Sequence, residues 1–272
     1  PVMKANLVQT AFLKISLTGF ELERSQRTPV NVAIVLDKSG SMSGEKMEQA
    51  RRAAMLAVDF LGADDIVSIV TYDNSVDVIV PATKVADKRA IKRKIEAIDA
   101  GGNTALFAGV SKGGAEIRKF FSKEKVNRVI LISDGLANVG PSTPTELGEL
   151  GMSLGRETIS VTTIGLGLGY NEDLMTQLAG FSDGNHAFAE NATDLIGIFQ
   201  NEFGDVMSVV AQEVDIQIKC SPTIRPIRVI GRDARVIGQT IHTRMNQLYS
   251  SQEKYILVEV EVPARSPGYS QD

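Results

Sequence analysis

Residues 30–41 read Val-Asn-Val-Ala-Ile-Val-Leu-Asp-Lys-Ser-Gly-Ser, and this stretch decides the fold. Its first seven residues are nearly all apolar and rich in β-branched side chains, which is typical of a central strand covered on both faces. The apolar run ends at Asp37, after which Ser39 and Ser41 place two hydroxyl groups on alternate residues. Gly40 gives the backbone freedom to curl, so that all three side chains can point to one centre. The stretch therefore predicts a buried strand that ends in a small cup of oxygen atoms.

An oxygen cup of this kind suits a hard divalent cation. Oxygen ligands without His or Cys are typical of Mg²⁺, Mn²⁺ and Ca²⁺ sites, and the small number of carboxylates favours Mg²⁺ or Mn²⁺ over a dedicated Ca²⁺ cage. Lys38, between the candidate ligands, either weakens cation binding or leans away into solvent. Helix capping by Asp37, Ser39 and Ser41, and by Thr104 farther along the chain, is the alternative interpretation.

Downstream of this stretch, apolar runs alternate with segments of helical spacing. Residues 44–61 repeat apolar side chains every three or four residues and predict an amphipathic helix. Residues 66–80 predict a hairpin, which places an antiparallel strand at the sheet edge. A capping box that begins at Thr143, with Pro144 at the first helical position, opens another helix. Six strand segments alternating with helices in residues 28–206 predict a doubly wound, mostly parallel α/β sheet with helices on both faces.

Two more polar residues lie where predicted strands give way to loops. Thr104 follows a glycine-rich segment, and Asp134 ends another apolar strand. Ligands of doubly wound sheets collect at the carboxyl ends of the strands, so we expect these segments to converge. The pattern resembles the von Willebrand factor type A domain, whose metal-ion-dependent adhesion site (MIDAS) begins with Asp-x-Ser-x-Ser after the first strand. The resemblance covers roughly residues 30–204 and rests on five residues in order: Asp37, Ser39, Ser41, Thr104 and Asp134.

This resemblance implies a set of metal ligands and a function. Ser39, Ser41 and Thr104 would contact the cation through their hydroxyl groups. Asp37 and Asp134 would act mostly through bound waters and hydrogen bonds. Since neutral ligands leave the cation short of negative charge, it keeps affinity for one more carboxylate. The resemblance therefore implies a non-enzymatic, divalent-cation-dependent protein-binding module, for adhesion or complex assembly, whose partner is a protein that supplies a Glu or Asp carboxylate.

Two other functions remain as alternatives. Some Mg²⁺-dependent phosphatases carry a nucleophilic Asp after the first strand, which makes Asp37 a candidate nucleophile of a phosphohydrolase. Such enzymes need a second carboxylate two residues later or an acidic pair in front, where this chain has Ser39 and residues 35–36, which are Val and Leu. The other alternative is an intracellular subunit of a chelatase-type ATPase assembly, although the sequence contains no phosphate-binding loop of its own.

Both ends of the chain have the two-residue periodicity of antiparallel strands. Residues 7–20 predict a half-buried strand with Phe12 or Leu13 on its inner face. About four strands follow residue 209, one of them running through residues 236–240. Since a lone strand needs partners, we expect a small β-sandwich built from both ends. Similar flanking sheets accompany bacterial members of the family and resemble the region beside the type A domain of inter-alpha-trypsin inhibitor heavy chains. The expected domains are residues 1–27 and 207–272 for the sandwich and 28–206 for the inserted α/β domain.

Composition excludes several classes of protein. The net charge of −4 and a charged fraction of 23% give no indication of a nucleic-acid partner. Cys220 is the only cysteine, so neither an intrachain disulfide nor a cysteine-based metal site can form. No apolar stretch is long enough to span a membrane, and residues 1–4 show no signal peptide. The location stays open, with an extracytoplasmic one favoured by the family resemblance.

Other motifs have plainer interpretations. A cluster of arginines is interpreted as surface ion pairs with Asp233 and Glu213, and a patch for an anionic partner is the alternative. The glycine-rich segment 165–169 has the wrong spacing for a dinucleotide loop and predicts a tight turn from strand to helix. His186 and His242 have no partner that indicates a ligand or switch role. The cluster comprises Arg225, Arg228, Arg232 and Arg235.

Overall fold

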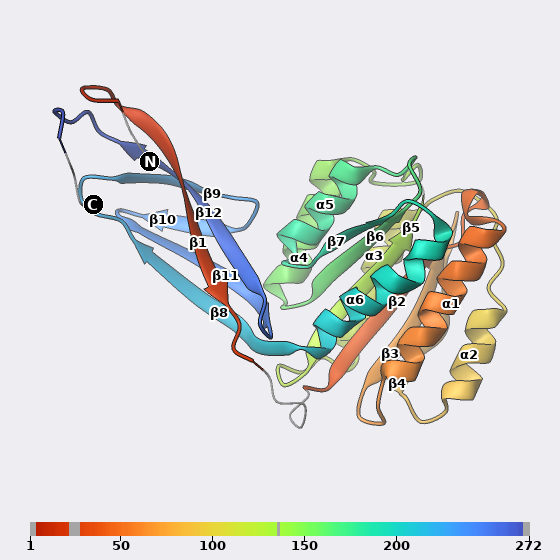
Figure 1. Ribbon diagram of the computed structural model, residues 1–272. Coiled ribbons are helices and arrows are strands. Elements are labelled where there is room, and N and C mark those ends of the chain that lie inside the picture. Colours follow the sequence, from red (N-terminus) through yellow and green to blue (C-terminus); the bar gives the residue numbers. More distant parts are fainter. Residues whose placement is uncertain (1–3, 22–27, 135–136, 269–272) are drawn as a thin grey trace. The chain divides into compact units, whose positions relative to one another are not determined.

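The computed structural model describes residues 4–21, 28–134 and 137–268. The chain forms two compact units (Figure 1): an α/β unit of residues 22–209, and a flanking β unit of residues 1–21 and 210–272. The start of the chain, residues 1–3, and the predicted domain boundary at residue 27 lie outside the described residues.

The α/β unit is built on a six-stranded sheet in the order β4-β3-β2-β5-β6-β7. Its strands are β2 (Val30–Asp37), β3 (Ile66–Tyr72), β4 (Val76–Lys84), β5 (Val126–Ser133), β6 (Ser160–Leu166) and β7 (His186–Ala189). All neighbouring strands pair in parallel except β3 and β4 at the edge, which pair antiparallel. The predicted mostly parallel sheet and its edge hairpin are confirmed.

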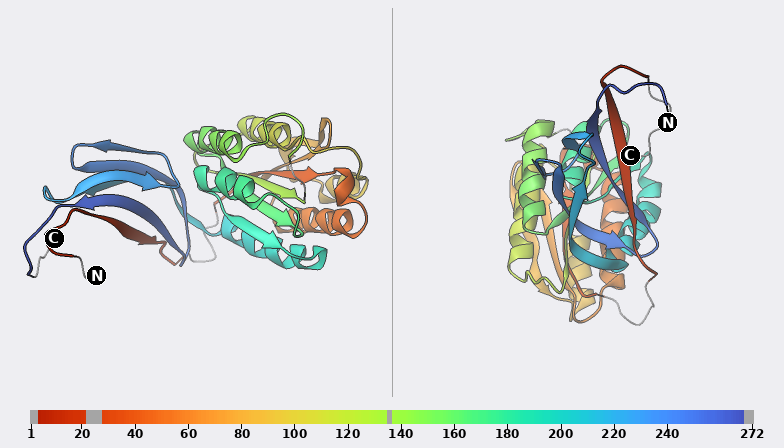
Figure 2. Two further views of the ribbon diagram at one scale, coloured as in Figure 1. Left: turned by 90° about the horizontal axis from the view of Figure 1, so that it is seen from above. Right: turned by 90° about the vertical axis from the view of Figure 1, so that its left-hand side faces the viewer.

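Helices cover both faces of this sheet, as Figure 2 shows. They are α1 (Glu45–Phe60), α2 (Lys88–Glu96), α3 (Leu106–Arg118), α4 (Pro144–Arg156), α5 (Glu172–Phe181) and α6 (Leu195–Met207), with 3-10 turns η1 (Gly40–Met42) and η2 (Ala192–Asp194). Side chains of α3, α4 and α5 share one buried cluster with the sheet. On the opposite face α1 packs on α6, where the rings of Phe60 and Phe203 stack with centroids 5.9 Å apart. This double cover explains why β2, β3, β5 and β6 are buried along their whole length. None of the helices in the described residues has the length and apolarity that a membrane crossing requires.

Helix α4 begins at the predicted capping box. The hydroxyl of Thr143 accepts a hydrogen bond from the backbone N–H of Glu146, and the Glu146 carboxylate accepts one from the backbone N–H of Thr143 at 3.0 Å. Pro144 occupies the first turn, where a missing N–H costs nothing. Two otherwise unpaired donors are thus satisfied, which confirms the predicted helix start.

The flanking β unit consists of two three-stranded sheets, in the orders β1-β12-β9 and β10-β11-β8. Its strands are β1 (Gln9–Thr18), β8 (Val209–Lys219), β9 (Arg225–Ile230), β10 (Ala234–Ile237), β11 (Thr240–Tyr249) and β12 (Glu253–Val262). Apolar side chains of β11 and β12 form one buried cluster, against which partly buried side chains of β1 and β8 pack. Antiparallel sheets from both ends of the chain, sharing one core, confirm this part of the predicted fold class.

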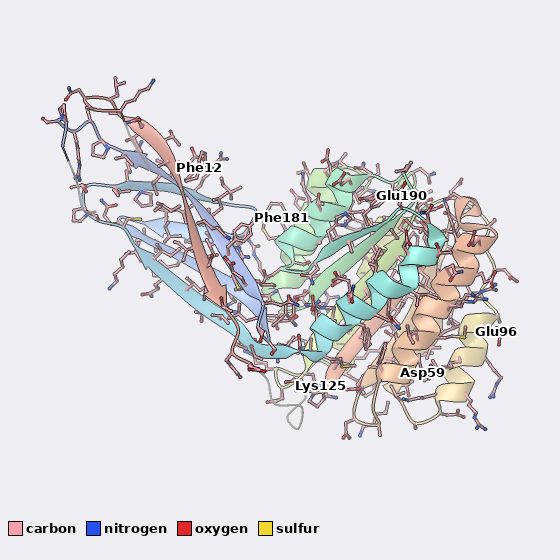
Figure 3. All side chains as sticks on the ribbon, in the orientation of Figure 1. Phe12, Asp59, Glu96, Lys125, Phe181 and Glu190 are labelled. Atoms are coloured by element: carbon pink, nitrogen blue, oxygen red, sulfur yellow. The ribbon has the colours of Figure 1, made fainter. Side chains whose placement is uncertain are left out.

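Strands β1 and β12 join the two ends of the chain in one antiparallel ladder, which starts with Gln9 opposite Val262. Leu13 lies opposite the buried Val258, on the same strand face as the core-packed Ile15, and is itself 38% exposed. Phe12, labelled in Figure 3, belongs to the other side of the strand and is 58% exposed. Of the two predicted inner residues, Leu13 is therefore the one that fits the pleat, because side chains alternate along a strand.

The strand predicted through residues 236–240 is wrong. β10 ends at Ile237 and β11 begins at Thr240, and these two residues lie opposite each other in an antiparallel pair. Gly238 between them has a φ of 59°, a left-handed conformation that glycine adopts without steric cost. The apparent alternation therefore crossed a hairpin turn. The remainder of β11 lacks clean apolar alternation because it buries polar residues such as Asn246.

Two of the clustered arginines form ion pairs across the sheet. Arg225 pairs with Glu261 at 2.8 Å, and Arg228 pairs with Glu259 at 2.6 Å. Both glutamates lie on β12, directly opposite their arginines, and not at the positions predicted to supply partners. The register of two strands far apart in the sequence decides this pairing. Exposed pairs of this kind add little stability.

Helices α4 and α5 approach each other closely at Gly151. A Cβ atom added to Gly151 would lie 2.4 Å from the carbonyl oxygen of Leu178 on α5. A clash with backbone cannot be relieved by turning a side chain, so the helices would have to separate. Gly151 therefore sets the spacing of the helix pair in this layer.

The variant Gly151→Ala is expected to lower the free energy of unfolding by about 1–3 kcal/mol, because it overpacks the contact between α4 and α5. Denaturant titration followed by circular dichroism measures the change. Gly204→Ala in α6 is the matched control, since nothing lies within 4 Å of its added Cβ. That control is expected to gain stability, as alanine is favoured over glycine in helices. Unchanged stability of Gly151→Ala would contradict the close contact.

Candidate metal centre

The candidate residues gather where the order of the strands reverses. From β2 the chain continues to β3 on one side, while β5, β6 and β7 extend the sheet on the other. Because β2 and β5 pair in parallel, with Leu36 opposite Ile132, their carboxyl ends lie side by side. In Figure 3, Glu190 after β7 marks this edge of the sheet, and Lys125 before β5 marks the opposite edge. Asp37 and Asp134 therefore enter the site from neighbouring strands.

Three of the predicted ligands are joined by hydrogen bonds. The hydroxyl oxygens of Ser39 and Ser41 lie 3.1 Å apart. The Ser41 hydroxyl donates to Oδ1 of Asp134 at 2.8 Å, across 93 residues of sequence. Ser39 and Asp134 are both buried. Two loops that are remote in the sequence thus bring two hydroxyl groups and a carboxylate to one place, as predicted.

Asp37 is the last residue of β2, just before the two serines, and is fully buried. Its Oδ1 accepts a hydrogen bond from the backbone N–H of Ser39 at 2.8 Å. Its Oδ2 accepts one from the Ser133 hydroxyl at 2.6 Å and one from the Tyr72 hydroxyl at 3.3 Å. Burial raises the pKa of the Asp37 carboxyl, although the hydrogen bonds from Ser133 and Ser39 oppose this shift. Burial and the nearby Asp37 charge likewise raise the pKa of Tyr72.

The loop that carries Thr104 docks on the first loop through backbone contacts. The N–H of Gly40 donates to the carbonyl of Gly102 at 2.9 Å, and the N–H of Gly101 donates to the carbonyl of Lys38 at 2.6 Å. The backbone of Thr104 is clamped by Asn138, whose Oδ1 accepts from the Thr104 N–H at 2.9 Å. Within the described part of the chain, no hydrogen bond joins the Thr104 hydroxyl to the serines. The structure thus places the backbone of the Thr104 loop against the first loop, whereas among the described residues the Thr104 hydroxyl makes no hydrogen bond to Ser39 or Ser41.

The turn between β3 and β4 supports both of these loops. The carbonyl of Asp73 accepts from the N–H of Ala105 at 2.8 Å, on the Thr104 side. Its carboxylate pairs with Lys38 of the first loop at 3.3 Å, and Asp77 pairs with the same ammonium at 3.0 Å. Burial lowers the pKa of Lys38, but the hydrogen bonds and charges of Asp77 and Asp73 outweigh it and raise the pKa overall. Lys38 thus leans away from the cup, onto acidic partners.

The capping alternative does not hold for the hydroxyl residues. Helix α1 has Gly44 at its N-cap and α3 has Ala105, neither with a side-chain hydrogen bond. Ser39 precedes η1 without capping it through its side chain. Helix capping therefore does not explain why the Ser39 and Ser41 hydroxyl groups lie together in the cup.

Sequence reasoning missed Lys46, in the first turn of α1. Its ammonium group pairs with Oδ2 of Asp134, whose side chain has no exposed surface. No distinct sequence signal indicated this contact, because Glu45 and Glu48 in the same first turn already place anions near the lysine. Ser133 was missed too, although it directly precedes Asp134 at a strand end.

The donor set fits a hard cation. Nowhere in residues 4–21, 28–134 and 137–268 do three His, Cys, Asp or Glu side chains gather as metal ligands, and the side-chain oxygens that meet in the cup are two hydroxyl groups and a carboxylate. The mutual repulsion of the buried carboxylates of Asp37 and Asp134 contributes to the raised pKa of Asp37. A divalent cation among these oxygens would offset that repulsion.

Comparisons with known proteins agree with this arrangement. The family model of the von Willebrand factor type A domain matches residues 31–201. An uncharacterized Synechocystis protein, sll0103, is 24% identical over 266 residues, which cover 94% of this chain and 63% of that protein. Inter-alpha-trypsin inhibitor heavy chain H3 of Bos taurus is 33% identical over 129 residues, 44% of this chain and 14% of that protein. The chain therefore spans less than two thirds of the length of these relatives.

Solved structures share the fold. A von Willebrand factor type A protein from Catenulispora acidiphila superposes with a TM-score of 0.75 at 17% identity, covering 97% of this chain and 68% of that one. Proximal thread matrix protein 1 from the mussel byssus, with a zinc-occupied MIDAS motif, superposes with a TM-score of 0.55 at 20% identity, covering 70% of this chain and 47% of that one. At these identities the likeness concerns the fold.

In the metal-free protein, the free energy of unfolding of Asp37→Asn relative to the wild type is expected to rise as pH rises from acidic to neutral, whatever the fixed cost of the hydrogen bonds that the amide cannot accept. Burial raises the folded-state pKa of Asp37 above its ordinary value of 3.8, so the folded wild type holds extra protons between the two pKa values. Its stability therefore falls as pH rises through that window, and the variant escapes this loss. The stability of the variant relative to the wild type should decrease as pH falls towards the ordinary value.

Urea titrations in EDTA, at neutral and at acidic pH, measure this difference. Asp99→Asn is the control, because the Asp99 side chain is 95% exposed and its charge is solvated in both states. If the difference in free energy of unfolding between Asp37→Asn and the wild type did not move in favour of the variant from acidic to neutral pH, the argument from burial would be wrong.

Proposed function

The chain belongs to the von Willebrand factor type A domain family, and from that premise we propose that it is a divalent-cation-dependent protein-binding module, for adhesion or complex assembly. The observation that carries the proposal is the junction of Ser39, Ser41 and Asp134 through hydroxyl and carboxylate oxygens. Because its relatives are longer, the chain would act as one module of a larger protein.

Five residues would hold the cation. Ser39, Ser41 and Thr104 would bind it through hydroxyl oxygens, and Asp37 and Asp134 through waters and hydrogen bonds. Mg²⁺ is the proposed metal, with Mn²⁺ and Ca²⁺ as alternatives. When bound, the cation supplies an open coordination position for a Glu or Asp carboxylate of a partner protein. The zinc-occupied MIDAS motif of the mussel protein supports a divalent cation in a domain of this fold.

The residues of this chain prepare that position. Asp37 holds the first loop through the Ser39 N–H, so both serines are presented without reorganisation. The turn at Asp73 fixes the Thr104 loop through the Ala105 N–H. A partly positive N-terminus of α1 lies next to the loop and favours an incoming anion. These contacts support recognition of a carboxylate, and no group among them is poised to break a bond.

The phosphohydrolase alternative has less support. Both oxygens of Asp37 accept hydrogen bonds from protein groups, and the side chain is fully buried. A nucleophile must instead reach the phosphorus atom of its substrate. The chelatase-type subunit requires the same docking chemistry as the adhesion module and differs in its partner. An extracytoplasmic location belongs to the proposal through the family resemblance alone.

Calorimetric titration with Mg²⁺ tests the proposed site. Wild type should bind Mg²⁺, and Ser41→Ala should bind it at least about tenfold more weakly, because a directly coordinating oxygen is lost. Ser41 is exposed, so the alanine is compatible with the fold. Ser43→Ala is the matched control: its hydroxyl donates to the Gly40 carbonyl and is not among the proposed ligands. Equal Mg²⁺ affinity in wild type and Ser41→Ala would refute the site.

Two further measurements separate the alternatives. In a peptide array, each peptide is made in two forms that differ only by Glu or Gln at one position. The protein should bind the Glu form in the presence of Mg²⁺ and dissociate from it in EDTA. Hydrolysis of p-nitrophenyl phosphate that disappears in Asp37→Asn would instead establish the enzyme.

A further inference from the structure

Lys46 and Ser41 share one buried carboxylate. The Ser41 hydroxyl donates to Oδ1 of Asp134, and the Lys46 ammonium pairs with Oδ2 of the same residue. The Asp134 side chain has no exposed surface, whereas that of Lys46 is 37% exposed. Lys46 therefore places a positive charge at the solvent side of the carboxylate that joins the cup.

The end of the lysine side chain is held in a defined place. A Cβ added to Gly167, in the turn after β6, would lie 3.8 Å from Nζ and 3.9 Å from Cε of Lys46. The ammonium group thus lies between Asp134 and this turn. The first turn of α1 also carries Glu45 and Glu48, but the carboxylate that pairs with the Lys46 ammonium group is that of Asp134.

Lys46 differs in this respect from Lys38, the other lysine near the cup. Lys38 turns to Asp73 and Asp77, two acidic residues outside the proposed ligand set. Lys46 instead turns to a proposed ligand. Its charge therefore acts directly on the electrostatics of the metal site.

The formal charges show what this lysine changes. Two carboxylates, Asp37 and Asp134, and one ammonium group sum to a single negative charge, so a divalent cation would leave the loaded site with a net positive charge. Without Lys46 the same loaded site would be neutral. A positive site attracts a carboxylate more strongly, and repulsion between two cations weakens metal binding.

We propose that Lys46 is a specificity-determining residue of the metal site, which weakens cation affinity in exchange for stronger binding of a partner carboxylate. This inference rests on the proposed function. Removing the Lys46 charge should therefore increase the affinity for the cation, although Lys46 contacts a proposed ligand.

Calorimetric titration of the full chain with Mg²⁺ tests this expectation. Lys46→Met keeps most of the length of the side chain and removes the charge, and it should bind Mg²⁺ about tenfold more tightly, as a nearby unit charge repels a divalent cation. Lys46→Arg keeps the charge and should match wild type. Arg52→Met is the matched control: it removes a positive charge from the same helix, where Arg52 pairs with Glu48.

Titration with glutarate in saturating Mg²⁺ provides the second arm, and Lys46→Met should bind this dicarboxylate more weakly than wild type. Thermal unfolding provides a readout independent of binding. In EDTA, Lys46→Met should unfold at a lower temperature, because the buried Asp134 carboxylate loses its partner, and added Mg²⁺ should raise that temperature more than in wild type.

The outcomes distinguish this inference from the proposed function. If wild type binds no Mg²⁺, the metal site itself is wrong. If wild type binds Mg²⁺ and Lys46→Met binds it equally or more weakly, Lys46 merely supports Asp134 and the inference is overturned. Tighter binding by Arg52→Met to the same degree would also overturn it, since the effect would then be one of net charge alone.

Discussion

Parallel pairing of β2 with β5 is the constraint on which the rest of the site depends. It brings Asp37 and Asp134 to the ends of adjacent covered strands, where both are buried. Carboxylates in such a place are tolerated only when donors or cations compensate for lost hydration. The hydroxyl groups of Ser133 and Ser41 and the ammonium group of Lys46 supply this compensation. The polar groups that keep the fold stable are thus the same groups that prepare it for a cation.

The geometry of the cup is set largely by backbone contacts between loops. The loop before Thr104 is held by Gly40 and Lys38, and the turn at Asp73 holds it from the other side. Gly102 makes this close approach possible, since its φ of 88° is a left-handed conformation and an added Cβ would lie 3.0 Å from Asp73. Because backbone groups make these contacts between the loops, replacing a single side chain of the cup should leave the positions of the loops largely unchanged.

Features encoded by neighbouring residues, such as the covered strand β2 and the capping box at Thr143, could be predicted from local patterns. The convergence of Ser41 and Asp134 could be predicted from the general rule that the carboxyl ends of the strands in a doubly wound sheet meet at one edge, whereas individual side-chain contacts between distant residues could not. The contact of Lys46 with Asp134 spans 88 residues and depends on the tertiary fold, which brings the first turn of α1 to the residue that follows β5. The turn at Gly238 was missed for a different reason: the alternation of residues 236–240 resembled one strand, but these residues span the turn between β10 and β11.

The ladder between β1 and β12 has a mechanical consequence. Gln9 and Val262 are opposite each other at one end of that antiparallel pair. A pulling force applied to these two residues would break the hydrogen bonds between the strands one pair at a time, because it acts on the end of the ladder and not on all its hydrogen bonds together. The α/β unit is inserted between these strands in the sequence, so the force would reach it only after the ladder had opened. The flanking unit would then unfold before any force reached the proposed metal site in the α/β unit.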